Sequence, residues 1–235
     1  MIPVVAAIRE AFARHADPAQ AGPMQAYMKS ALRFHGIPAP LRRRLQAQAV
    51  REHPCASPAE LAAAMRELWQ HAAAREEWYA AAELARTGRH RPLLTLELLP
   101  EFEALIAGTA WWDLCDEVSC QPLPVLLEAE PAAMRRTLRR WSRGDDLWLR
   151  RAAILAQRKL RDGFDAALLY DCIEPSLDDA RFRRAFFITK GIGWALRERS
   201  YDAPDEVRAY CARHAERLAP LTVREALKAL KRRGV

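Results

Sequence analysis

The 235-residue sequence lacks the features of a secreted or membrane protein. No apolar run approaches the roughly 20 residues that span a bilayer. The N-terminal segment mixes charged residues into its apolar positions, unlike a signal peptide. We therefore expect a chain that is neither secreted nor embedded in a membrane. Its 51% hydrophobic and 29% charged content is typical of a folded protein with a substantial core.

Metal-binding, redox and nucleotide motifs are also missing. The five cysteines form an odd set without a CxxC pair, and the six histidines are scattered without HExxH spacing. This usage favours a reducing, cytoplasmic location and predicts no metal site. The sequence contains no GxGxxG, GxxxxGKS/T or GxSxG motif, so it offers no phosphate cradle and no nucleophile elbow. We expect no cofactor.

The alternation typical of strands is nearly absent, and residues 94–98 are its one clear example. Elsewhere apolar residues recur at three- and four-residue spacing, and prolines divide the chain into roughly a dozen helical segments. The sequence therefore predicts an all-α protein, organised as a single domain over residues 1–235. Ser57, followed by Pro58 and Glu60, predicts one helix start, and Thr222 with Glu225 predicts the start of the last helix.

Similar helical segments recur along the chain. Their aromatic residues Trp78, Trp112, Trp148 and Phe187 are 34, 36 and 39 residues apart. A period of this size favours a HEAT-like α-helical repeat solenoid, in which stacked helix pairs curve around a concave surface. Any helical protein with one aromatic residue per long helix would show similar loose spacing, and this alternative stays open.

The positive charge is concentrated in one block. Residues 134–161 hold nine arginines, one lysine and two aspartates, a local net charge of +8 in a chain whose net charge is +7. Such a block is typical of a surface that binds a polyanion, because neutralising phosphates releases counterions. Arginine supplies 32 of the 37 basic residues, so codon bias or an ordinary solvated helix face is the alternative explanation, although the charge slightly favours nucleic acid.

Two helical faces combine aromatic and charged residues. Trp112 and Asp116 are four residues apart, which places an indole beside a carboxylate, a pair suited to binding a cation. The competing interpretation is a half-buried tryptophan packed between repeats, with Asp116 either capping a helix or paired with an arginine. Trp194 and Arg197 share a second face, next to two glycines in a predicted helix, where each glycine costs about 1 kcal/mol relative to alanine.

Further basic and aromatic residues are candidates for contact with phosphate. They are Tyr27 and Lys29 in an N-terminal helix and Arg150 and Arg151 after Trp148. Each of them is equally compatible with an ordinary surface role.

These residues stand in an order that resembles the AlkD-type DNA alkylation repair enzymes. The resemblance runs from about residue 20 to the C-terminus and rests on Tyr27-Met28-Lys29, Phe34-His35-Gly36-Ile37-Pro38, Arg66-Glu67-Leu68-Trp69, Trp111-Trp112-Asp113 with Asp116, Trp148-Leu149-Arg150-Arg151, Ile192-Gly193-Trp194 with Arg197, and Leu218-Ala219-Pro220-Leu221. It implies a HEAT-like DNA glycosylase with a concave basic face that removes N3- and N7-alkylated purines from duplex DNA.

The resemblance also implies the site. It places the catalytic carboxylate at Asp116, aromatic walls at Trp112 and Trp194, and backbone-holding residues at Tyr27, Arg151 and Arg197. We add Lys29 as a DNA-binding candidate. Gly191 departs from the family pattern beside Trp194, and we expect it to alter the position of that wall.

The expected activity is monofunctional, in a monomer acting on DNA in the cytoplasm, associated with the nucleoid. Poor removal of neutral damage such as uracil follows, because only a cationic base is already a good leaving group. Two alternatives stay open. One is a catalytically silent repeat protein that binds damaged or branched DNA, and the other is a scaffold for an acidic protein partner.

Overall fold

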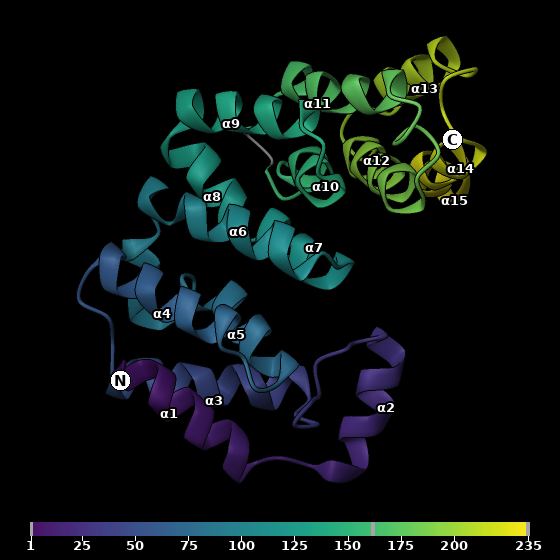
Figure 1. Cartoon of the computed structure of the whole chain (residues 1–235). Helices are drawn as coiled ribbons and strands as arrows, with labels where there is room; N and C mark the ends of the chain where they lie inside the picture. Colours follow the sequence, from purple (N-terminus) through teal and green to yellow (C-terminus); the bar gives the residue numbers. More distant parts are fainter. Residues whose placement is uncertain (1, 161–162, 234–235) are drawn as a thin grey trace. The chain divides into compact units, whose positions relative to one another are not determined.

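The computed structural model describes residues 2–160 and 163–233. Within these ranges the chain forms 15 α-helices and two short 3₁₀ helices, so the all-α prediction is confirmed (Figure 1). The chain divides into two compact units, unit 1 (Met1–Leu105) and unit 2 (Ile106–Val235). The single-domain organisation stays a prediction. None of the described helices is long and apolar enough to cross a membrane.

Unit 1 contains the N-terminal helices. They are α1 (Pro3–Arg14), α2 (Pro18–Met28), α3 (Ala39–Glu52), α4 (Pro58–Gln70), α5 (Arg75–Leu84), the 3₁₀ helices η1 (Gly88–Leu93) and η2 (Leu96–Leu98), and most of α6 (Leu99–Thr109), which continues into unit 2. The predicted cap of α4 is confirmed, since the Ser57 hydroxyl accepts a hydrogen bond from the Glu60 N–H at 3.2 Å. The alternating segment 94–98 forms no strand and mostly lies in η2.

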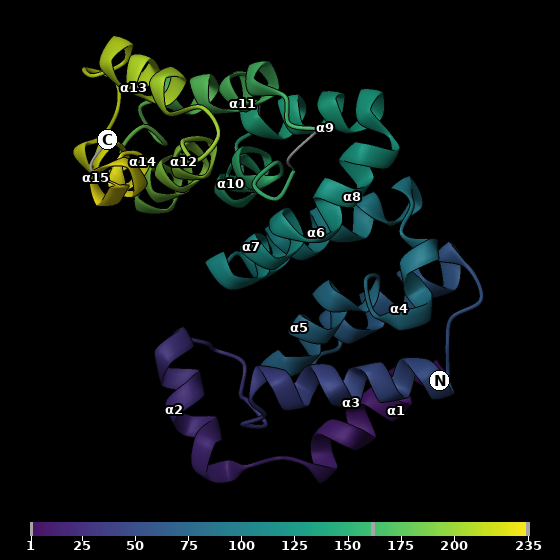
Figure 2. The ribbon, with the colours of Figure 1, turned by 180° about the vertical axis from the view of Figure 1, so that it is seen from behind.

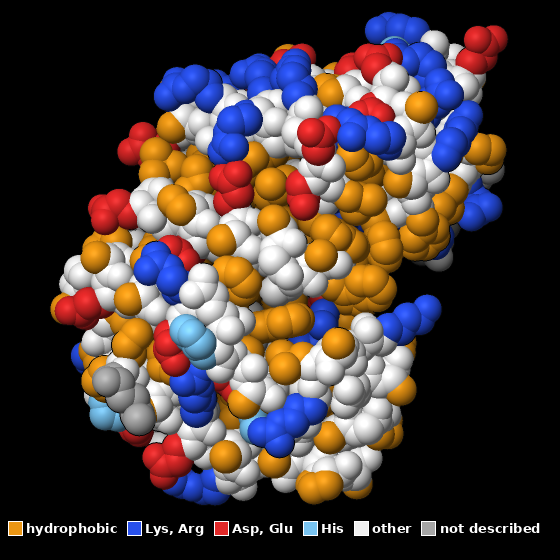
Figure 3. Space-filling view, viewed as in Figure 1, with side chains coloured by type: hydrophobic (Ala, Val, Ile, Leu, Met, Phe, Trp, Pro, Cys, Tyr) orange, Lys and Arg blue, Asp and Glu red, His pale blue; other side chains and the backbone are white. Residues whose placement is uncertain are grey.

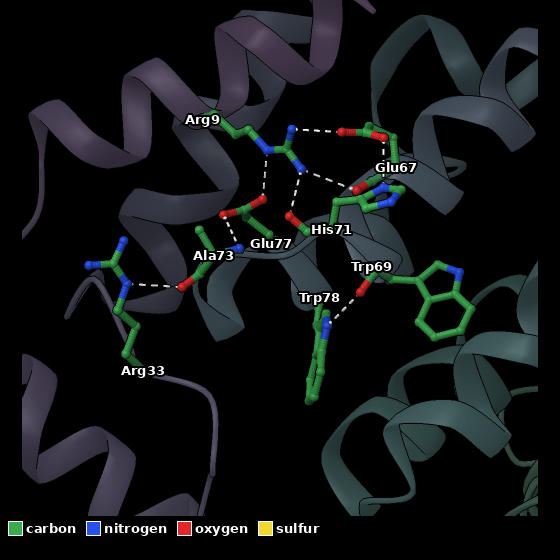
Figure 4. A network of polar contacts seen from close by, with 8 residues as sticks. All are labelled: Arg9, Arg33, Glu67, Trp69, His71, Ala73, Glu77 and Trp78. Carbon is green, nitrogen blue, oxygen red and sulfur yellow. Dashed lines mark hydrogen bonds and ion pairs between the residues drawn. The ribbon is translucent and has the colours of Figure 1, made fainter.

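Arg9 joins three helices of unit 1 (Figure 4). From α1 its guanidinium donates to Glu67 on α4 and to Glu77 on α5, both at 2.8 Å, and to the backbone carbonyls of Glu67 and His71. Nearby, the Trp78 indole N–H donates to the Trp69 carbonyl at 2.9 Å. These contacts connect α1 to the α4–α5 pair through polar groups, beside the apolar core.

Glu76 fixes the turn that precedes α3. Its buried carboxylate accepts hydrogen bonds from three consecutive backbone N–H groups, those of His35, Gly36 and Ile37, at 2.9–3.1 Å. Gly36 has φ +86°, and a Cβ there would lie 2.1 Å from the Asp17 carbonyl oxygen. Only glycine therefore allows this turn to lie against the start of α2, the helix that carries Tyr27.

Unit 2 contains the remaining helices. They are α7 (Trp112–Cys120), α8 (Pro122–Ala129), α9 (Pro131–Arg143), α10 (Leu147–Leu155), α11 (Ala166–Asp178), α12 (Phe186–Arg199), α13 (Pro204–Arg213), α14 (Pro220–Ala226) and α15 (Lys228–Arg233). Figures 1 and 2 show α9, α11 and α13 following one another in one row and α10, α12 and α14 in a second row beside it. Helix α7 packs on α10, which packs on α12, which packs on α14. This two-layer arrangement of successive pairs fits an α-helical repeat fold.

Local sequence sets where the inner helices begin. Asp146 caps α10 by accepting from the N–H groups of Trp148 and Leu149 at 2.8 Å, so the arginines that follow lie in its first turns. The predicted cap at Thr222 is wrong, because α14 already begins at Pro220. The Thr222 hydroxyl instead donates to the Thr189 carbonyl of α12 at 2.9 Å, which ties these two helices together.

Candidate functional site

A cavity of about 440 Å³ lies in unit 2 and collects five of the sequence-predicted residues of that unit. Its lining includes Trp112 and Asp116 from α7, Arg151 from α10, and Phe187, Trp194 and Arg197 from α12. Figure 3 shows hydrophobic side chains at the surface over α12. A larger cavity, about 610 Å³, lies in unit 1 beside Ile2, Glu52 and Cys55, and none of the predicted site residues lines it.

Asp116 and Arg151 form a bidentate ion pair at the wall of this cavity. Arg151 Nε and Nη2 donate to the two carboxylate oxygens of Asp116 at 2.8 Å each. Arg151 Nη1 also donates to the Phe187 carbonyl of α12. The Asp116 side chain is 14% exposed and that of Arg151 is 4% exposed. A carboxylate held in this way has a fixed orientation and one small opening toward the cavity.

Burial raises the pKa of Asp116 above its ordinary value, and the contacts with Arg151 act in the opposite direction. The close bidentate geometry favours the ionised pair at neutral pH. Both interpretations of Asp116 made from the sequence are therefore present together, because it shares a cavity with an indole and is paired with an arginine.

The two tryptophans of the cavity, Trp194 and Trp112, have different neighbouring side chains. The guanidinium carbon of Arg158 lies 3.5 Å from the ring centroid of Trp194, so a cation already covers one side of that indole. Arg158 is held in turn by Cys120 and Glu198. Trp112 begins α7 next to Trp111, whose ring joins an aromatic cluster with Trp148 and Phe187; the centroids of the latter two are 4.8 Å apart.

The two glycines of α12 serve different contacts. A Cβ on Gly191 would lie 3.0 Å from Arg151 Nη1, so Gly191 leaves room for the guanidinium that holds Asp116. The sequence-based expectation linked Gly191 to the wall at Trp194, but the nearest atoms belong to Arg151. A Cβ on Gly193 would lie 2.7 Å from the Glu225 Cβ and 3.0 Å from the Thr222 carbonyl oxygen, so Gly193 permits α14 to approach closely.

The phosphate-contact candidates have separate locations. Arg197 lines the cavity, whereas Tyr27 and Lys29 belong to unit 1. Tyr27 is 78% exposed on α2, and Lys29 ends this helix in a left-handed conformation with φ 49°. Arg151 is only 3% exposed and bonded to Asp116, so its geometry suits orienting a carboxylate better than holding a DNA backbone. Their contacts with DNA stay predictions.

Arg150 was predicted to be either a phosphate contact or an ordinary surface residue, and its burial fits neither role. It is 3% exposed, and it donates to the carbonyls of Gly144 and Pro175 and pairs with Asp179. Arg150 is therefore a buried structural residue that connects the start of α10 to the end of α11.

Much of the basic block 134–161 is neutralised inside unit 2. Arg135 pairs with Asp165, Arg139 with Asp171, and Arg158 with Glu198, in addition to the pairs of Arg150 and Arg151. Figure 3 shows basic side chains over α9 with acidic ones among them. Arg161 lies outside the described residues. The local charge of +8 therefore overstates the charge that the described part of this block offers to a polyanion.

Five cavity residues were missed in the sequence: Phe186, Phe187, Lys190, Glu225 and Lys228. Phe187 was noted only as a repeat anchor, and Lys190 and Glu225 were not considered as site residues. Lys190 lies four residues before Trp194 and seven before Arg197, so it shares their helical face and could have been found from this spacing. Glu225 comes from α14 and carries no local pattern that links it to α12.

Comparisons with known proteins agree with this architecture. The sequence profile of the DNA alkylation repair enzyme family matches residues 8–230. A solved structure described as a predicted DNA alkylation repair enzyme from Enterococcus faecalis is 29% identical, with a TM-score of 0.79 over 91% of this chain and 95% of that one. Among curated proteins, no significant match was found. The chain belongs to the DNA alkylation repair enzyme family.

Proposed function

We propose that this protein is a DNA glycosylase that hydrolyses the N-glycosidic bond of N3- and N7-alkylated purines in duplex DNA. The observation that carries the proposal is the Asp116 carboxylate, mostly buried and fixed in orientation, in one cavity with the indoles of Trp112 and Trp194. This combination of a full negative charge and π faces suits a cationic reacting group.

The chemistry follows from the charge of the lesion. Alkylation at N3 or N7 leaves the purine positively charged, so the bond to the sugar breaks with its electron pair moving onto the base, which leaves neutral. Positive charge then develops on the deoxyribose, and water adds at C1′ and releases a proton. Asp116 stabilises the developing positive charge electrostatically and orients the attacking water.

Arg151 acts on this reaction through Asp116. Its two N–H groups hold both carboxylate oxygens, and its third contact, to the Phe187 carbonyl, ties the pair to α12. The arginine thus keeps the carboxylate ionised and aimed in spite of burial, which would otherwise favour the neutral acid. We assign to Arg151 the positioning of Asp116, and its contact with the DNA backbone stays a prediction.

DNA would be held by Tyr27, Lys29 and Arg197, and the protein would act as a monomer in the cytoplasm, associated with the nucleoid. Such contacts to phosphates position the duplex without reading its sequence. Selectivity would come from the charge of the lesion. A neutral base such as uracil would leave as an anion, so its departure would gain less from the Asp116 carboxylate than the departure of a cationic base.

The competing function is a catalytically silent member of the family that binds damaged DNA. It is favoured by the tight Asp116–Arg151 pair, which also suits a purely structural role. Chromatography of bases released from methylated duplex separates the two functions. The proposal expects 7-methylguanine and 3-methyladenine from methylated duplex and no uracil from uracil-containing duplex. Duplex binding without release of either purine would favour the silent protein, and efficient uracil release would contradict the proposed chemistry.

A further inference from the structure

Glu225 connects two cations at the edge of the cavity. Its Oε1 accepts from Lys190 Nζ at 3.1 Å, and its Oε2 accepts from Arg197 Nη1 at 2.7 Å. The Glu225 side chain is 10% exposed, Arg197 23% and Lys190 44%. All three residues line the same cavity as Asp116, and Lys228 lines it too. One carboxylate thus lies among three positive charges, all of which are at least partly open to solvent.

The packing of α14 on α12 builds this cluster. Gly193 lies between Lys190 and Arg197 on α12, and its missing side chain leaves the space that the Glu225 Cβ approaches. The Thr222 hydroxyl, one turn before Glu225, donates to the Thr189 carbonyl of α12. Gly193, although glycine is unfavourable within a helix, therefore lets α14 place the Glu225 carboxylate between Lys190 and Arg197.

Glu225 is an anion in this setting. Burial acts to raise the pKa of its carboxyl group, but the hydrogen bond from Lys190 and the charges of Lys190, Lys228 and Arg197 outweigh it and lower the pKa below the ordinary value. The carboxylate therefore neutralises part of the positive charge that the cavity edge would present to an approaching polyanion.

We infer that Lys190 and Arg197 form a subsite for a DNA phosphodiester and that Glu225 is its built-in counter-ion, which orders the two cations and weakens their hold on undamaged DNA. This inference rests on the proposed action on duplex DNA. Only one of the three N–H groups of Lys190 and one of the five of Arg197 is needed for the bonds to Glu225, so both side chains keep donors for a phosphate.

The charge arrangement sets the direction of the effect. A phosphodiester bound to Lys190 and Arg197 lies close to the Glu225 carboxylate, and the two negative charges repel each other. Replacing Glu225 with glutamine removes this repulsion and keeps one oxygen that accepts from either cation. Affinity for undamaged duplex therefore increases, and one additional phosphate charge is neutralised by the protein.

The test uses Glu225→Gln with Glu206→Gln as its matched control. Glu206 accepts from Arg199 in the same unit, so its substitution changes the net charge equally outside the cavity. Affinity for a fluorescently labelled undamaged duplex is measured over a range of salt concentrations. We expect Glu225→Gln alone to bind several-fold more tightly at low salt, with a salt slope steeper by up to about 0.9, the value for one phosphate.

A further variant addresses folding. Lys190→Gln leaves the contact between Glu225 and Arg197 in place, and we expect it to bind undamaged duplex several-fold more weakly than wild type, with a shallower salt slope. Thermal unfolding of all three variants checks that they are folded. Equal affinities of Glu225→Gln and Glu206→Gln, or no loss in Lys190→Gln, would overturn the inference. Wild-type protein that binds no duplex at all would instead overturn the proposed function.

Discussion

At the scale of single residues, buried charges with specific partners define the site and its supports. Asp116 is the clearest case, because burial raises its pKa while the chemistry requires its ionised form. The rate of base release should therefore fall as the solution is acidified, beginning at a higher pH than an ordinary aspartate, with a pKa near 3.9, would give. Single-turnover rates across pH, corrected for spontaneous depurination, measure this limb.

Duplex affinity measured over the same pH range separates chemistry from binding. If the loss of rate is due to protonation of Asp116, affinity stays constant where the rate falls. If the rate falls only at or below the pKa of an ordinary aspartate, burial does not control the ionisation of this carboxyl group.

Glu76 is the residue on which the turn before α3 depends. Glutamine at this position keeps one side-chain oxygen but replaces the other with an amide NH₂ group, which cannot accept from a backbone N–H. At least one of the three buried hydrogen bonds is therefore lost. We expect Glu76→Gln to reduce the free energy of unfolding by about 1–3 kcal/mol. Denaturant unfolding measures the change, and Glu10→Gln, which removes an exposed carboxylate, is the control. Equal stability of the two variants would contradict this role of Glu76.

At the scale of elements, α12 is central because it supplies cavity residues and contacts both α10 and α14. Sequence spacing predicted that Trp194 and Arg197 share a face, as they do on this helix. It could not show that Gly191 faces Arg151 or that Gly193 faces Glu225, because the partners come from helices about 30 to 40 residues away and glycine leaves no pattern of its own.

The two glycines give a paired prediction. Alanine gains up to about 1 kcal/mol of helix propensity at either position. At Gly193 the new methyl group would overlap Glu225 Cβ and backbone atoms of Thr222, so we expect Gly193→Ala to lower stability by about 1–3 kcal/mol. At Gly191 the methyl group meets the guanidinium of Arg151, so base release falls more than stability does.

Denaturant unfolding and the single-turnover release of alkylpurines, measured for both variants, test these two predictions. The account fails at the element scale if Gly193→Ala is more stable than wild type, or if Gly191→Ala releases alkylpurines at the wild-type rate.

At the scale of the whole molecule, sequence composition and detailed structure lead to different expectations for DNA binding. Composition located a block of positive charge at residues 134–161, but it could not reveal that five of its arginines have acidic partners, since these lie 29 to 40 residues away along the chain. The all-α class was predictable because the 3.6-residue period persists along the chain. Which charges stay available depends on tertiary contacts.

The salt dependence of duplex binding follows from this pairing. Ten free cations would give a slope of about −9 in a plot of log affinity against log salt concentration. With at least half of the block paired inside unit 2, we expect the block to contribute no more than about half that value to the slope. Titration of an undamaged duplex at several salt concentrations measures it. A slope near the full value would mean that the internal ion pairs open on DNA.

The central claim is that the Asp116 carboxylate drives loss of a cationic purine. The most direct measurement is the single-turnover release of 7-methylguanine from a defined duplex by wild type, Asp116→Asn and Asp171→Asn. Asp171 pairs with Arg139 outside the cavity, so its variant also removes a carboxylate from an arginine. We expect release at least about 100-fold slower for Asp116→Asn, as for loss of one electrostatic stabiliser, and unchanged for Asp171→Asn. Release by folded Asp116→Asn at the wild-type rate would contradict the account.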